Sequence, residues 1–94
     1  MKTPEGYEKA DVKKYLDTIG AYHFWPVPGG YGKQGVDCYA CIKGRFWAIE
    51  VKKDMKTAPT ARQRMTLLEV ESGGGRTVCG DAAYIIEVLR VDGN

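Results

Sequence analysis

Residues 36–52 read VDCYACIKGRFWAIEVK and carry the clearest structural pattern in the chain. Two runs rich in strand-forming residues, 36–42 and 45–52, flank Lys43-Gly44, a two-residue connection typical of a tight β-hairpin. A symmetric turn at this point pairs residues whose numbers sum to 87. This register predicts that Asp37 lies directly opposite Glu50, on the same face of the sheet.

The predicted pairing brings two carboxylates together. Directly opposed residues have Cβ atoms about 4.5–5.5 Å apart, and like charges at that distance are destabilising unless something neutralises them. A divalent cation would do so, because Mg²⁺ binds one or two carboxylates together with water and substrate phosphate oxygens. Lys52 follows Glu50 by two residues and shares its face, where an ammonium could orient or help deprotonate a metal-bound water. Acids on an ordinary solvated strand would show the same spacing, so both interpretations stay open.

The second strand of the hairpin also predicts which face of the sheet is buried. Trp47, Ile49 and Val51 make one face strongly apolar, and that face is expected to lie against the core. The other face mixes Phe46 and Ala48 with the charged residues. We expect it to be partly covered, a setting in which a carboxylate needs a partner.

The rest of the chain predicts helices and strands around this hairpin. A helix begins at Thr3-Pro4-Glu5 and ends at Gly20, and a strand covers 21–25. A second helix runs from Ala58-Pro59-Thr60 to about Ser72 with Met65, Leu68 and, less clearly, Leu67 as its apolar side, a strand covers 76–79, and Asp81 caps a last helix. A strand over 84–88 is the alternative for that last element. The predicted order is α-β-β-β-α-β-α, in one α/β domain spanning residues 1–94.

Composition and charge exclude several classes of protein. The 94 residues are 44% hydrophobic and 11% aromatic, which is typical of a folded chain, and the net charge of +2 excludes a polybasic nucleic-acid binder. Residues 33–64 hold eight basic and three acidic groups, a local charge of +5. This excess indicates either a surface facing a polyanion or ordinary solvated side chains. Because so small a domain has a thin core, oligomerisation is plausible.

The cysteines favour a reducing compartment. Cys38, Cys41 and Cys79 are too few and odd in number for a disulfide framework. A strand sends Cys38 and Cys41 to opposite faces, which argues against a zinc or redox pair, and His23 is the single histidine, expected on a strand surface. No run of about 18 apolar residues is present, so we expect no membrane association and a cytoplasmic protein.

Four segments together resemble a known nuclease family. The run Gly30–Asp37, the turn Lys43–Arg45, the strand Phe46–Lys52 and the segment Thr60–Gln63 are similar to the virus-type replication-repair nuclease domain, VRR-NUC, of the PD-(D/E)XK superfamily, in its stand-alone phage and bacterial type. The resemblance extends from Thr3 to about Asp81. It implies a restriction-endonuclease-like fold, with a mixed β-sheet flanked by helices. Val36 departs from the proline that usually precedes the aspartate.

The resemblance also implies roles for individual residues. Asp37 and Glu50 would bind Mg²⁺ or Mn²⁺, with the backbone carbonyl of Val51 as a further ligand, and Lys52 would serve the attacking water.

Two helical residues complete this implied set. Gln63 would line the site, although Thr60 and Gln63 also form the pattern of a helix capping box. An acid of the first helix would assist near the metal, with Glu5 favoured and Glu8 as the alternative.

The implied activity is a metal-dependent DNA endonuclease without a nucleotide cofactor. By analogy it acts as a homodimer on branched DNA such as a Holliday junction, in the host cytoplasm if phage-encoded. Basic residues around the implied site and on the neighbouring loops are candidates for phosphate contacts: Lys33, Lys53, Lys56, Arg62 and Arg64, and on the loops also Lys43 and Arg45. The alternative is a catalytically idle DNA-binding or interaction module that retains the nuclease fold.

Overall fold

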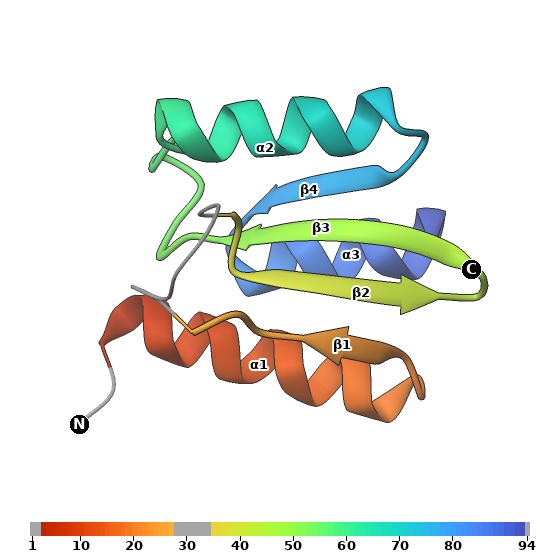
Figure 1. Ribbon diagram of the computed structural model, residues 1–94. Helices are drawn as coiled ribbons and strands as arrows, with labels where there is room; N and C mark the ends of the chain where they lie inside the picture. Colours follow the sequence, from red (N-terminus) through yellow and green to blue (C-terminus); the bar gives the residue numbers. More distant parts are fainter. Residues whose placement is uncertain (1–2, 28–34, 94) are drawn as a thin grey trace.

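The computed structural model describes residues 3–27 and 35–93 as an α/β fold (Figure 1). Its elements are α1 (Pro4–Thr18), β1 (Tyr22–Phe24), β2 (Cys38–Ile42), β3 (Arg45–Val51), α2 (Ala61–Ser72), β4 (Arg76–Gly80) and α3 (Ala82–Asp92). This order confirms the predicted α-β-β-β-α-β-α succession. The last element is a helix, so the alternative of a strand over 84–88 is wrong.

The four strands form one mixed sheet in the order β1-β2-β3-β4. β1 pairs with β2 and β2 with β3 in antiparallel fashion, whereas β4 runs parallel to β3. The hairpin register is the predicted one, since Cys38 pairs with Ile49 and Ile42 with Arg45. Lys43 and Gly44 have φ values of 50° and 82°, the left-handed conformation that a two-residue hairpin turn of this type requires.

Helices cover both faces of the sheet. The main core joins α1 and α3 to one face of the central strands, where Leu16 and Ile85 pack with Trp47 and Ile49, all of them at most 1% exposed. A smaller cluster joins α2 to the opposite face through Leu67, Ala48 and Val36 (Figure 1). The alternation of β3 side chains across the sheet therefore separates a large apolar layer from a smaller one that carries charge.

The buried side of α2 differs from the prediction. Thr66 and Leu67 are buried and Val70 packs against the smaller cluster, while Met65 and Leu68 are 65% and 58% exposed. The capping box of Thr60 and Gln63 begins the helix at Ala61, and the face that then meets the sheet is set by contact with β3 and β4. Apolar residue type alone was a poor guide here, because a half-polar helix offers two nearly equivalent faces.

The cysteine prediction agrees with the structure. Cys38 is buried in the main core and Cys41 is exposed on the other face, so the two thiols cannot act as a pair. Burial raises the pKa of the Cys38 thiol to about 12.

The sequence predicts His23 on a strand surface, but its side chain is only 16% exposed because it packs between Trp25 and Asp17. Its Nδ1 accepts a hydrogen bond from Trp25 Nε1, and its Nε2 lies 2.6 Å from Asp17 Oδ1.

No helix among the described residues combines the length and the hydrophobicity that a membrane span requires.

Candidate active site

Two carboxylates lie side by side where β2 begins and β3 ends. Asp37 directly precedes β2, and Glu50 is the second-last residue of β3. The backbone N–H of Asp37 donates to Glu50 Oε1 at 3.1 Å, and the backbone N–H of Val51 donates to Asp37 Oδ2 at 2.8 Å. Each carboxylate is thus held by the backbone of the other strand, which fixes the separation of the two acids.

Glu50 carries its charge in a buried position. The residue is only 2% exposed, and burial, followed by the nearby charge of Asp37, raises the pKa of its carboxyl to about 7. Lys52 acts in the opposite direction, with its Nζ 3.2 Å from Glu50 Oε2. The protein's own positive charge therefore compensates the Glu50 carboxylate only in part.

Lys52 is held from its other side by Gln63. The Lys52 ammonium donates to Gln63 Oε1 at 2.9 Å, and the same oxygen accepts the backbone N–H of Thr60 at 2.9 Å. The Gln63 backbone N–H in turn donates to Thr60 Oγ1 at 3.2 Å, which completes the capping box. The Gln63 side chain thus caps the helix and contacts Lys52 at the same time, so the two predicted roles do not exclude each other.

Lys9 on α1 joins this cluster, and the sequence interpretation did not include it. Its Nζ lies 3.2 Å from Asp37 Oδ1 and 3.4 Å from Glu5 Oε2. Burial lowers the pKa of the Lys9 ammonium, but the Asp37 and Glu5 carboxylates outweigh burial and the net shift is upward. The four-residue spacing of Glu5 and Lys9 is a readable helix pair, whereas the contact with Asp37 depends on how α1 packs.

The two acids considered on the first helix have different surroundings. Glu8 Oε1 accepts the backbone N–H of Ala82 at 2.9 Å and so satisfies a free donor at the beginning of α3. Glu5 reaches Asp37 through Lys9. Of the two, Glu5 is the one whose contacts connect it to the carboxylate pair.

No family model matches the sequence, and no curated protein matches it. A solved structure described as a VRR_NUC domain has a TM-score of 0.78 against this chain at 22% sequence identity, covering 95% of this chain and 97% of that one. The chain has the fold of a VRR_NUC domain. The predicted fold class is thereby confirmed.

Several predicted phosphate-binding residues surround the carboxylate end of this VRR_NUC-like fold. Lys53 and Lys56 follow β3, Arg62 and Arg64 lie in the first turn of α2 on either side of Gln63, and all four are exposed. Lys33 lies outside the described residues, and Lys43 and Arg45 lie at the hairpin turn, at the other end of β3. The other four place positive charge near the partly buried Asp37 and the buried Glu50.

The donor set suits a small hard cation. Within residues 3–27 and 35–93, no three His, Cys, Asp or Glu side chains group as metal ligands, so the carboxylates on offer are Asp37 and Glu50. Two carboxylates and a backbone carbonyl such as that of Val51 match the few protein oxygens that Mg²⁺ takes before water and phosphate complete its shell. The partly compensated charge of buried Glu50 is the observation that favours a cation here.

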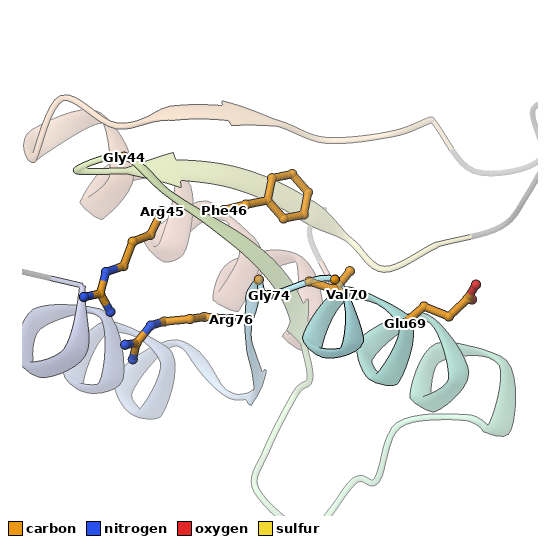
Figure 2. Close-up of a pocket in the computed structure, with 9 residues that line it drawn as sticks. Gly44, Arg45, Phe46, Glu69, Val70, Gly74 and Arg76 are labelled. Carbon is orange, nitrogen blue, oxygen red and sulfur yellow. The ribbon is translucent and has the colours of Figure 1, made fainter.

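A hollow lies at the other end of β3. It has a volume of about 670 Å³ and is lined by the hairpin residues 44–46, by Glu69 and Val70 of α2 and by residues 73–76. Figure 2 shows Arg45 and Arg76 extending side by side, away from Phe46 and Glu69. None of the predicted catalytic residues lines this hollow.

Proposed function

We propose that this protein is a metal-dependent endonuclease that hydrolyses phosphodiester bonds in DNA. The observation that carries the proposal is the pairing of partly buried Asp37 with buried Glu50, whose carboxylates lie 3.1 Å or less from each other's strand backbone and are accompanied by the Lys52 ammonium. The VRR_NUC-like fold supports the proposal, and the resemblance of the sequence to VRR-NUC nucleases implies this chemistry at Asp37, Glu50 and Lys52.

Asp37, Glu50 and the Val51 carbonyl would hold Mg²⁺ or Mn²⁺ in this proposal. A divalent cation bound there supplies Lewis-acid stabilisation of charge on a phosphoryl oxygen and a water of lowered pKa. Lys52 forms an ion pair with Glu50 and a hydrogen bond with Gln63, and these contacts would hold its ammonium in position to orient the attacking water. Gln63 positions Lys52, and Glu5 would assist from α1.

The exposed cations around the site would position the nucleic acid. Lys53, Lys56, Arg62 and Arg64, together with Lys33, would contact phosphates and carry no sequence information. We propose branched DNA such as a Holliday junction as the substrate and a homodimer as the acting species, since two identical sites can cut two strands symmetrically. The products would carry 5′-phosphates, and the protein would act in the cytoplasm, that of the bacterial host if it is phage-encoded.

The test compares wild type with Glu50→Gln, which keeps the shape of the side chain and removes its charge. Each protein is incubated with a synthetic four-way junction, a duplex and a single strand, in Mg²⁺, Mn²⁺ or EDTA. We expect wild type to cleave the junction best and only with metal, and Glu50→Gln to lose activity on the order of 10³-fold because a ligand charge is gone. Glu87→Gln removes an exposed charge on α3 that pairs with Arg90 among the described residues, and it should cleave like wild type.

Cleavage that survives both EDTA and Glu50→Gln would contradict the mechanism. DNA binding without cleavage in any metal would instead favour the idle binding module. Light scattering on the same samples tests the homodimer, which a monomer mass at assay concentration would exclude.

A further inference from the structure

Every oxygen of the Asp37 and Glu50 carboxylates already has a partner. Asp37 Oδ2 accepts from Val51 and Glu50 Oε1 accepts from Asp37, both through backbone N–H groups that belong to the strands. The remaining oxygens, Asp37 Oδ1 and Glu50 Oε2, face the ammonium groups of Lys9 and Lys52. A cation that binds both carboxylates must therefore share or displace a lysine.

The two lysines are held very differently. The Lys52 side chain is 8% exposed and donates to the neutral oxygen of Gln63, so moving it would leave buried groups without partners. The Lys9 side chain is 32% exposed, and its contacts in the described part of the chain are the carboxylates of Asp37 and Glu5. Lys9 is therefore the one that can leave at little cost.

We propose that Lys9 is the counter-ion of Asp37 in the cation-free protein and competes with the metal for Asp37 Oδ1, with Glu5 retaining the displaced ammonium. This inference rests on the proposed metal site. The Lys9 ammonium, 3.2 Å from Asp37 Oδ1, neutralises the carboxylate in the absence of metal. A divalent cation that binds the same oxygen is repelled by this ammonium. Glu5 Oε2, already 3.4 Å from Lys9 Nζ, provides the nearby acceptor. Lys9 is thus a positioning residue that weakens cation binding and stabilises the empty site.

Calorimetric titration with Mn²⁺ tests this competition in the absence of DNA. We expect Lys9→Met to bind Mn²⁺ about 5- to 10-fold more tightly than wild type, because removal of the ammonium frees Oδ1. Lys9→Arg retains the competing charge and should stay within about twofold of wild type. The matched control is Lys14→Met, which removes the same charge from an exposed position further along α1, and about twofold is the most we expect there.

Thermal unfolding gives a second readout that does not depend on activity. Without metal, Lys9→Met should unfold at a lower temperature than Lys14→Met, since Asp37 loses its counter-charge. Saturating Mn²⁺ should raise its midpoint more than that of wild type, in line with tighter binding.

The outcomes separate this inference from the proposed function. Equal affinities for Lys9→Met and Lys14→Met, or weaker binding by Lys9→Met, would overturn the competition. If wild type then still binds Mn²⁺ and Glu50→Gln does not, the proposed metal site stands without it. Absence of Mn²⁺ binding in all proteins would overturn both. Should Lys9→Met fail to fold, Lys9→Gln provides the same comparison.

Discussion

The two ends of β3 differ in whether their charged side chains form ion pairs. At the Glu50 end, a charged cluster of Glu5, Lys9, Asp37, Glu50 and Lys52 is joined by ion pairs of 3.4 Å or less, and Glu50 is 2% exposed. At the hairpin end, Arg45 and Arg76 are exposed beside a hollow of about 670 Å³, and neither makes an ion pair with another described residue (Figure 2). The hollow is thus separate from the charged cluster that we propose as the active site.

The difference is that the proposed site consists of charges held by ion pairs around a buried glutamate, whereas the hollow is bordered by exposed arginines. Water screens the exposed arginines, so each costs little where it stands. Burying Glu50 costs free energy, which Lys52 and the backbone N–H of Asp37 offset only in part, as its raised pKa indicates. A site for a cation and a phosphate needs such fixed charges rather than a deep cavity.

The largest expected effect on cleavage comes from replacing a cation by methionine at the Glu50 end of β3, compared with the same kind of replacement at the hairpin end. Lys52→Met should lower cleavage on the order of 10²- to 10³-fold, because it removes the ammonium that would orient the attacking water. Arg45→Met should leave cleavage within about threefold of wild type and stability within about 0.5 kcal/mol, as for most exposed positions. Single-turnover cleavage and urea unfolding check both values. Comparable losses of cleavage in Lys52→Met and Arg45→Met would contradict the assignment of the active site to the Glu50 end of β3.

A smaller effect is expected in the pH dependence of stability. Folding raises the Glu50 pKa from its ordinary 4.5 to about 7, so the folded protein binds a proton over this interval that the unfolded chain has released. Metal-free wild type should therefore lose up to about 2–3 kcal/mol of stability as the pH rises from about 4.5 to 7.

Two comparisons check this pH dependence. Glu50→Gln cannot titrate and should lack this component, and Mg²⁺ should restore stability to wild type near pH 8. Urea unfolding measured from pH 4 to 8 provides the data. Parallel curves for wild type and Glu50→Gln would show that the carboxyl does not titrate in this range.

The smallest effect separates the two uses of Gln63. Gln63→Ala and Thr60→Ala each break the capping box and should each cost about 1 kcal/mol of unfolding free energy. Only Gln63→Ala also releases the Lys52 ammonium, so it alone should slow cleavage, by about 10-fold. Thermal unfolding and cleavage rates are measured on both variants. An equal loss of activity in Thr60→Ala would assign the effect to the helix start instead.

Local rules predicted a large part of the fold. The hairpin register followed from the turn at Lys43-Gly44, and it placed Asp37 and Glu50 together correctly because a two-residue turn leaves one pairing. The capping box at Thr60 and the cap at Asp81 marked the starts of α2 and α3. The same local reasoning gave the wrong buried face for α2, where Met65 and Leu68 are exposed.

The sequence by itself determined the features that depend on residues close together along the chain. These are the strands, the helix caps and the pairing of two carboxylates across one hairpin. Only the tertiary structure decided that α2 presents Leu67 to the sheet, that Glu8 meets the beginning of α3 and that Lys9 reaches Asp37. Lys9 and Asp37 are 28 residues apart on different elements, so their contact exists only once α1 packs beside the sheet. Periodicity and turn chemistry act over a few residues, whereas such contacts depend on the burial of whole faces.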